Sequence, residues 1–323
     1  MARVTVKRKA EKAKREKIKA SIGLDGLSGT GKTGTALAIA GVLTNNDWDK
    51  VYLADAESDS SKLYIGKTLH TGATVGEFYQ NSLDAETGYS PFNYDFMRKE
   101  AIELGCEVFI QDSFSHAWFR EGGVLHTKSL HESGSDKRYS NSYSAWGHPD
   151  VADGKNLLFD LIRSTKVHSI STLRIKESFV LEPGDGTKSK VVSVGEKQIT
   201  TEGLTYEFDL LLRLLEPGDT KKNKAPRVQV LKSRYDILER DEEYELTPEL
   251  LLSIKEYLEE GTSVEEIESK MHEELVESIR NRAKENKNLM LIFKKMHPDK
   301  KVSDLTLKEL RKVNSEFIQI EYN

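Results

Sequence analysis

The sequence predicts an α/β protein with a mainly parallel sheet flanked by helices, extended by β-hairpins and followed by a helical C-terminal region. Three observations carry this prediction. Short apolar strands alternate with helical segments up to about residue 173, strand-like pairs separated by turn signals follow from about residue 179, and helix-forming sequence begins at Pro248. Strands that alternate with helices are typical of parallel βαβ units, whose sheets are covered on both faces.

The elements of the core follow in a regular order. We predict strands at 20–25, 50–54, 107–111 and 167–173, with helices at 33–42 and 155–164 and another helix ending at 104. Further strands are expected at 179–181, 191–194, 206–214 and 228–231, separated by Pro-Gly turn signals at 183–186 and 217–219. These later strands are typical of hairpins and are expected to extend the same sheet.

Charge and pattern divide the chain into three parts. Residues 1–19 form a basic arm, residues 20–245 the α/β core and residues 246–323 a helical region. The arm has no apolar segment of the secretory type, and it either contacts nucleic-acid phosphates or forms a solvated tail. In the helical region, Thr247 is expected to cap the first helix and Pro248 to begin it.

The composition is polar and contains little cysteine. Hydrophobic residues make up 37% and charged residues 31% of the 323 residues, and the net charge is -5. We find no run of 18 apolar residues, so no membrane span is expected. Cys106 is the only cysteine, which excludes an intramolecular disulfide and an all-cysteine zinc site. These features favour a reducing, cytoplasmic setting.

A glycine-rich segment connects the first predicted strand to the first predicted helix. Glycines allow the backbone to curl so that several N–H groups point at phosphate oxygens. Lys32 would supply a positive charge to the β- and γ-phosphates, and the Thr33 hydroxyl would complete a magnesium shell. The dipole of the following helix also favours an anion. The sequence therefore predicts a site for ATP and Mg²⁺ at Gly26, Leu27, Ser28, Gly29, Thr30, Gly31, Lys32, Thr33 and Gly34.

Two carboxylates lie just after the predicted strands 107–111 and 50–54. Asp112 comes directly after strand 107–111, where a carboxylate can hold the water shell of a magnesium ion, or else cap the next helix. Glu57 lies just past strand 50–54. A carboxylate there can orient or deprotonate the water that attacks the γ-phosphate. The alternative for Glu57 is an ordinary surface carboxylate in a loop.

The sequence segments around both carboxylates resemble those of bacterial RecA. Asp55-Ala56-Glu57 is similar to the Asp-Ala-Glu of RecA, whose glutamate is the hydrolytic one, and Asp112-Ser113 is similar to the Asp-Ser of its second magnesium motif. The resemblance implies a RecA-like P-loop NTPase core in which Glu57 is the catalytic base and Thr33 and Asp112 hold the metal. RecA-like proteins place a residue that senses the γ-phosphate at the end of the third strand. This chain has Ser171 and Thr172 there, where RecA has glutamine.

Three downstream segments resemble a narrower group. Residues 171–176, 194–197 and 202–209 look like phage-encoded AAA-type ATPases with a minimal RecA core, a group associated with single-strand annealing and recombination. The resemblance covers roughly residues 20–240. It implies ATP-dependent work on single-stranded DNA by a homo-oligomer, a ring or a filament, in the host cytoplasm. A single-strand-binding or replication protein would be a further partner.

A pair of cations follows the last predicted strand of the core. Lys232-Ser233-Arg234 resembles the Lys-x-Arg pair that RecA-family assemblies insert into the neighbouring subunit's ATP site. Side chains at alternate positions of a strand point the same way, so both cations can reach one anion. We expect Lys232 and Arg234 to act catalytically across a subunit boundary. The alternative is a charged strand end.

Residues 119–150 form a long polar stretch with little regular period. Such a stretch is either a functional loop or disordered, and a functional loop here would face DNA or close over the nucleotide. Candidate DNA contacts are Lys128, Lys137 and Arg138 for phosphates and Tyr139, Tyr143 and Trp146 for stacking on bases. Arg174 and Lys176 contact phosphate or line a loop. His116, His126, His131 and His148 are spaced too irregularly to favour a metal site.

Two functions of different classes account for these features. The first is an ATPase that is stimulated by single-stranded DNA and acts in recombination, annealing or replication. The second is a nucleotide-switched assembly or loading factor that binds a protein partner through its C-terminal helices. A metabolic kinase is a weaker third interpretation, because no small-substrate site is evident in the sequence.

Overall fold

A mixed sheet lies at the centre of the computed structural model, which describes residues 19–163, 166–182, 190–215, 225–259 and 264–322. The basic arm up to residue 18 and the two Pro-Gly turn signals lie outside the described residues. Within them the sheet has nine strands in the order β3-β2-β4-β5-β1-β7-β8-β9, and β6 pairs with β5 alone. The predicted α/β class with a mostly parallel sheet flanked by helices is confirmed.

The parallel part of the sheet contains six strands and the antiparallel part three. The parallel strands are β1 (Ser21–Gly26), β2 (Val51–Asp55), β3 (Tyr79–Ser82), β4 (Val108–Asp112), β5 (His168–Glu182) and β7 (Leu210–Leu214). The antiparallel strands are β6 (Lys190–Gln198), β8 (Arg227–Ser233) and β9 (Glu243–Glu245).

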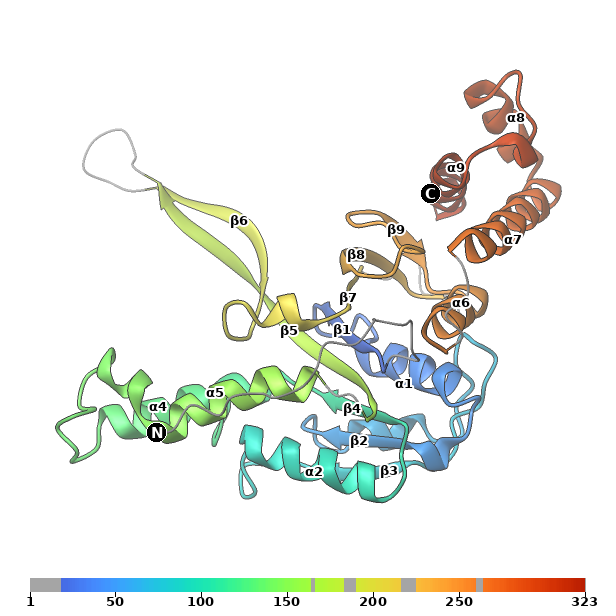
Figure 1. Ribbon diagram of the computed structural model, residues 1–323. Helices are drawn as coiled ribbons and strands as arrows, with labels where there is room; N and C mark the ends of the chain where they lie inside the picture. The colour runs from blue at the N-terminus through green and yellow to red at the C-terminus, as the bar shows by residue number, and fades with distance from the viewer. Residues whose placement is uncertain (1–18, 164–165, 183–189, 216–224, 260–263, 323) are drawn as a thin grey trace, which may run out of the picture.

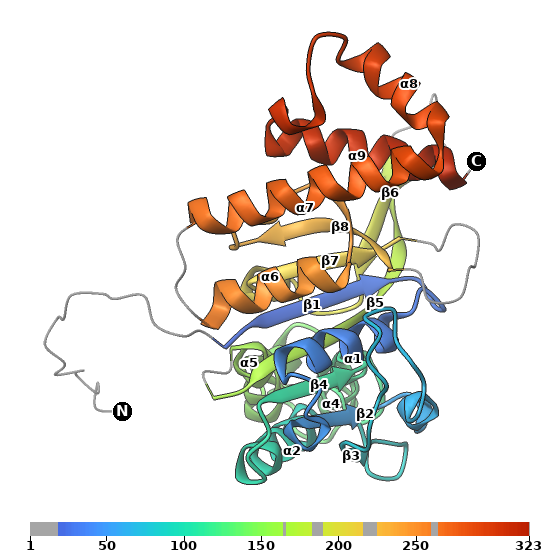
Figure 2. The ribbon, with the colours of Figure 1, turned by 90° about the vertical axis from the view of Figure 1, so that its right-hand side faces the viewer.

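Helices cover both faces of the sheet, as Figure 2 shows. One face packs against α1 (Lys32–Leu43) and α6 (Pro248–Glu259), and the other against α2 (Pro91–Glu103), α3 (His116–Phe119), α4 (Val124–Glu132) and α5 (Pro149–Ile162). The connection from β1 to β2 crosses the sheet in the opposite direction to those from β2 to β4 and from β4 to β5. Right-handed crossovers therefore place α1 on one face and α2 and α5 on the other. In open α/β sheets, ligands bind at the carboxyl edge of the strands where the connections diverge in this way.

Strand β5 is longer than its neighbours in the sheet. It pairs with β1 as far as Arg174, and beyond that point it pairs only with β6. The two strands form an arm that projects from the sheet (Figure 1). This hairpin therefore continues the nine-stranded sheet along β5 and does not add a strand at its edge. The strand expected at 206–214 begins only at Leu210, because Leu204–Glu207 forms a 3-10 helix.

The stretch 119–150 is more regular than expected. It contains α4 and a 3-10 helix at Ser144–Gly147, and α5 begins at Pro149 rather than near residue 155. The expectation of a stretch without regular structure is wrong for α4, because Val124 on this short helix is buried against α5 and its surroundings. The early start of α5 has a local cause: the His148 side chain accepts the Asp150 N–H at 3.2 Å, and Pro149 occupies the first helical position.

The C-terminal helices belong to two different hydrophobic cores. Helix α6 packs into the core of the sheet through Leu250, Leu251 and Ile254. Its predicted cap is confirmed, since the Leu250 N–H donates to Thr247 Oγ1 at 3.3 Å. Helices α7 (Val264–Glu285), α8 (Lys287–Met296) and α9 (Leu307–Tyr322) form a core of their own around Phe293 and Phe317. In the described part of the chain, no helix is both long and apolar enough to cross a membrane.

Candidate functional site at the carboxyl edge of the sheet

The glycine-rich loop between β1 and α1 has a backbone that only glycine adopts easily. Gly29 and Gly31 have φ angles of 85° and 90°, in the left-handed region. At Gly26, a Cβ atom would lie 2.8 Å from Thr30 Oγ1 and 3.1 Å from the Leu214 carbonyl oxygen. Any side chain at residue 26 would therefore displace the loop from β7.

The N-terminus of α1 is open toward the loop. Among the described residues, no side chain caps it, and its first turn holds no acidic residue. The first N–H groups of the helix and its positive dipole end are thus available to an anion. The Lys32 ammonium donates to the carbonyl oxygens of Gly26 at 2.9 Å and Leu27 at 2.7 Å. Burial lowers the pKa of Lys32, an effect that the carboxylates of Asp112 and Glu57 partly oppose.

Asp112 accepts hydrogen bonds from two threonines at the end of β4. Thr33 Oγ1 on α1 donates to Oδ2 at 2.5 Å, and Thr172 Oγ1 on β5 donates to Oδ1 at 2.5 Å. Strand β5 lies between β1 and β4, which brings Thr172 between the glycine loop and Asp112. Burial raises the pKa of Asp112, and the two hydroxyl donors partly oppose that shift. The structure thus brings together the two residues, Thr33 and Asp112, that the sequence predicts as metal ligands.

Glu57 is held by an arginine from a distant part of the chain. Arg174 Nη2 lies 2.6 Å from Glu57 Oε2 and 2.7 Å from Oε1, and Arg174 Nε lies 3.1 Å from Oε1. Because Arg174 pairs in register with Gly26 across β5 and β1, this ion pair stands beside the glycine loop. Both carboxylate oxygens of Glu57 are engaged in this arrangement.

The loop that carries Glu57 is organised by Asp55. Asp55 is buried at the end of β2 and accepts the Glu57 N–H at 2.7 Å and the Ser61 hydroxyl at 2.5 Å. Gln80 Oε1 on β3 also accepts from the Ser61 hydroxyl at 3.0 Å. The oxygens of Asp55 are therefore occupied in shaping the loop, which makes Asp55 a positioning residue.

One further residue at this edge, Tyr64, has no clear signal in the sequence. The Tyr64 ring lies 3.0 Å from the place where a Cβ at Gly34 would stand, so it covers the first turn of α1. Burial raises the pKa of Tyr64, and the nearby Asp112 carboxylate raises it further. Of the two candidates for a phosphate sensor, Ser171 is bound by Gln111 inside the sheet, whereas Thr172 reaches Asp112.

Lys232 and Arg234 lie away from this edge, at the other end of the sheet. Lys232 donates to the carbonyl oxygens of Tyr206 and Phe208, and Arg234 lies one residue past β8 and pairs with Asp209 at 3.0 Å. The expected geometry of two cations on alternate positions of one strand is therefore wrong. Both cations bind the segment before β7 of their own chain.

The candidate DNA contacts are distributed over several environments. Lys128 is 8% exposed and donates to Glu132 and Ser142, so it lies inside its segment. Lys137 and Lys176 are exposed, and Arg138 pairs with Asp136 at 2.7 Å. Of the aromatic candidates, Tyr143 is 91% exposed, Trp146 stacks on Trp118, and Tyr139 packs edge-on against His148.

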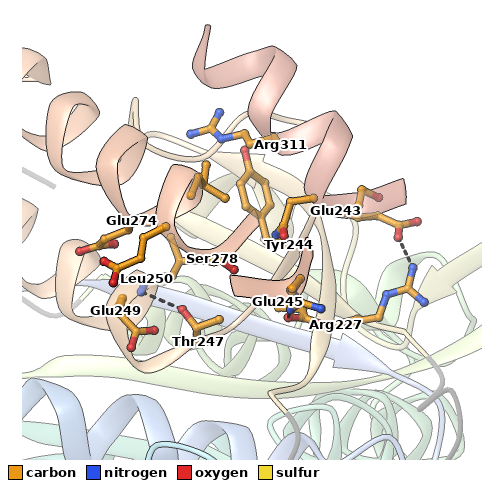
Figure 3. Close-up of a pocket in the computed structure, with 15 residues that line it drawn as sticks. Arg227, Glu243, Tyr244, Glu245, Thr247, Glu249, Leu250, Glu274, Ser278 and Arg311 are labelled. Carbon is orange, nitrogen blue, oxygen red and sulfur yellow. Dashed lines mark hydrogen bonds and ion pairs between the residues drawn. The ribbon is translucent and has the colours of Figure 1, made fainter. Parts of the chain in front are cut away.

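A cavity of about 340 Å³ opens between the sheet and the C-terminal helices (Figure 3). Its wall includes Tyr244 of β9, whose ring lies 5.1 Å from the Arg311 guanidinium of α9. Arg282 of α7 pairs with Glu245 at 2.9 Å across the same junction. This cavity is separate from the carboxyl edge and marks the contact between the two hydrophobic cores.

Comparison with known proteins gives no match, neither to a protein family nor to a curated protein. The class of protein therefore has to be argued from the fold and the site. One edge of the α/β sheet carries a glycine loop, an uncapped helix N-terminus and a buried Asp–Thr pair. Together these features define a candidate site for a phosphate with a divalent cation.

Proposed function

We propose that the chain is a Mg²⁺-dependent ATPase whose site is the carboxyl edge of β1, β2, β4 and β5. The proposal rests on one observation: the glycine loop, Lys32 and the contact between Thr33 and Asp112 lie close together. The glycine loop leads into the uncapped N-terminus of α1, Lys32 lies within the same loop, and Thr33 touches Asp112. Phosphate oxygens would accept from the loop N–H groups and from Lys32, which would exchange its present carbonyl partners for them.

The donor set at Asp112 fits Mg²⁺. This cation prefers oxygen ligands and keeps several waters, so one carboxylate and one hydroxyl beside the phosphates are sufficient. Burial raises the pKa of Asp112, so a cation bound beside it would stabilise the charged carboxylate. When bound, Mg²⁺ would neutralise charge on the phosphate oxygens. Thr172 would keep the Asp112 carboxylate oriented through its hydrogen bond to Oδ1.

Glu57 is the residue best placed to orient or deprotonate the attacking water. A general base needs a free oxygen lone pair, and Arg174 engages both oxygens of Glu57. Withdrawal of Arg174 would therefore free the oxygens of Glu57 for the attacking water. A guanidinium matches phosphate oxygens as well as it matches a carboxylate, so the γ-phosphate would draw Arg174 away from Glu57. We thus assign Arg174 to the nucleotide rather than to DNA.

Single-stranded DNA is the proposed effector, on the strength of the sequence resemblance and of one structural link. The β5–β6 arm contacts the nucleotide edge at its root: Arg174 of β5 binds Glu57, and Gln198 of β6 donates to the buried Asp25 that precedes the glycine loop. Arg213 also pairs with Asp25, at 2.9 Å. A strand of DNA bound to the arm would therefore have a direct physical path to the ATP site.

Phosphate release with and without oligo-dT tests this function. We expect Mg²⁺-dependent hydrolysis that oligo-dT stimulates, and stimulation that weakens steeply as salt rises, because phosphate contacts release counterions. Lys32→Ala serves as the inactive control. Hydrolysis that DNA leaves unchanged would retain the ATPase and remove the DNA role, whereas no hydrolysis under any condition would contradict both.

A nucleotide-switched assembly factor is the second candidate. It is favoured by the separate core of α7, α8 and α9 and by the cavity that lies between this core and the sheet. Leu291 on α8 is 67% exposed and borders a groove with Lys284 and Lys294 on its rim. An acidic, partly apolar segment of a partner protein would fit this groove. Nucleotide-dependent binding of such a partner without DNA stimulation would favour this candidate.

A further inference from the structure

Two histidines and an aspartate meet where α4 approaches α5. His131 lies in the last turn of α4, His148 caps α5, and Asp150 lies in the first turn of α5. One ligand atom from each of the three lies within 4.8 Å of the others, and in the described part of the chain no other group of three or more such side chains does so. The irregular spacing of these histidines in the sequence argued against a metal site, and the fold brings two of them together.

The separations between these atoms suit a single metal ion. His131 Nε2 lies 3.2 Å from Asp150 Oδ2, and His148 Nδ1 lies 3.6 Å from the same oxygen. Two ligands at zinc distances on a tetrahedron lie about 3.3 Å apart, so the observed spacing needs little change. The two imidazole rings stack with their centroids 3.3 Å apart. Metal binding would tilt these rings so that their nitrogen lone pairs converge, and the His148 nitrogen would give up the Asp150 N–H.

We propose that His131, His148 and Asp150 bind a divalent transition metal of the Zn²⁺ class, with water in the fourth position. Two imidazole nitrogens and one carboxylate oxygen are a donor set that Zn²⁺ favours and that Mg²⁺ does not. The site is independent of the nucleotide edge, whose donors are the oxygens of Thr33 and Asp112.

The metal would act as a clamp on the segment between α4 and α5. His131 and the pair on α5 stand at the two ends of residues 133–147, which carry the exposed side chains of Lys137, Arg138 and Tyr143. A bond through the metal would fix both ends of this segment and restrict its opening. Tyr139 packs edge-on against the His148 ring at 4.7 Å, so the middle of the segment already rests on one ligand.

Zn²⁺ titration of the full chain in excess Mg²⁺ tests the site. Wild type should bind one Zn²⁺ per chain that Mg²⁺ does not displace. His131→Gln, His148→Asn and Asp150→Asn should each weaken binding by more than about tenfold, because each removes a ligand. Asparagine at 148 retains a helix-capping acceptor, and Asp150 is 64% exposed on its side chain, so neither change should prevent folding. His297→Gln, on a histidine outside the cluster, is the matched control and should bind as wild type does.

Limited trypsin digestion supplies a readout that does not depend on ATPase activity. Cleavage after Lys137 and Arg138 should slow when Zn²⁺ is added to wild type and to His297→Gln, but not when it is added to His131→Gln. The last variant also corrects for any effect of Zn²⁺ on trypsin. Equal Zn²⁺ affinity in wild type and the three ligand variants, or displacement of Zn²⁺ by Mg²⁺, would overturn the site. Cleavage that Zn²⁺ does not slow would overturn the clamp.

Discussion

The polar side chains at the carboxyl edge of the sheet and those at the end of β8 differ in the partners that they contact. At the carboxyl edge, Lys32 and Thr33 of α1 converge with Asp112 of β4, and burial raises the pKa of Asp112. At the β8 end, Arg234 already pairs with Asp209, and Lys232 donates to nearby carbonyl oxygens. The first region gathers its polar side chains around one point, as the proposed nucleotide site requires. The second is satisfied within its own chain, so a role in catalysis would require these contacts to be exchanged at a subunit boundary.

Lys32→Ala should have the largest effect, because it removes the only side-chain cation of the glycine loop. We expect ATP affinity to fall by at least about 100-fold, and turnover to disappear with it, since hydrogen bonds to charged groups contribute strongly. Equilibrium binding of a labelled ATP analogue measures the loss of affinity. Lys99→Ala, on an exposed residue of α2, is the control. Undiminished affinity in Lys32→Ala would refute the site.

Arg234→Ala tests whether the β8 end acts across a subunit boundary. An arginine supplied in trans contributes on the order of 10³-fold or more to turnover. We expect Arg234→Ala to lose this contribution to turnover and to bind ATP almost normally. In the wild type, ATPase activity should rise faster than linearly with protein concentration. Arg240→Ala, on an exposed arginine nearby, should leave turnover unchanged.

Mixing two inactive variants sharpens this test. Lys32→Ala and Arg234→Ala together should recover part of the activity, because some interfaces would combine an intact loop with an intact arginine. Mixtures that demonstrably co-assemble yet stay inactive would mean that Lys232 and Arg234 act within their own chain or not at all.

Glu57→Gln should slow turnover by about 10²-fold or more and leave ATP binding intact, as expected when a water-activating carboxylate is lost. Single-turnover hydrolysis separates the two steps. Glu77→Gln, on an exposed glutamate beyond the loop, provides the comparison. Turnover within a few-fold of wild type would remove Glu57 from the mechanism.

Asp112→Asn should change the stability of the fold only slightly, and the change should be an increase. The same substitution should weaken the site. Because burial raises the pKa of Asp112, its charged form destabilises the folded state at neutral pH, and that penalty is relieved as pH falls through the raised pKa. Asparagine carries no charge. Without Mg²⁺ the variant should therefore melt at or above the wild-type temperature, and the difference should shrink at acidic pH.

The same variant should lose Mg²⁺-dependent ATP binding. Thermal unfolding with and without Mg²⁺-ATP measures both properties in one series. A variant that melts below wild type at neutral pH and is still stabilised by Mg²⁺-ATP would contradict the role given to Asp112.

The sequence predicts features that depend on local pattern or on parallel topology. The strands β1, β2 and β4 and helix α1 follow from short apolar runs and the glycine loop. The contact between Thr33 and Asp112 follows because parallel strands bring their carboxyl ends to one edge. Pairings between distant segments could not be predicted. Arg174 reaches Glu57 only because β5 lies beside β1, and no spacing in the sequence encodes that neighbour.

The stretch 119–150 shows why sequence pattern fails for short helices. Helix α4 has few apolar residues and is stabilised by tertiary contacts, so its period is weak. Lys128 resembles a free surface cation in the sequence, yet the fold encloses it between Glu132 and Ser142. His131 and His148 meet because the chain reverses between α4 and α5, and this reversal depends on contacts that a linear pattern does not record.

Equilibrium binding of a fluorescent ATP analogue, measured with Mg²⁺ and again with EDTA, tests the central claim most directly. The claim is that the carboxyl edge is a site for ATP with Mg²⁺. We predict saturable binding of one nucleotide per chain in Mg²⁺, competition by unlabelled ATP, and much weaker binding in EDTA. Absence of saturable binding in Mg²⁺ by correctly folded protein would contradict it.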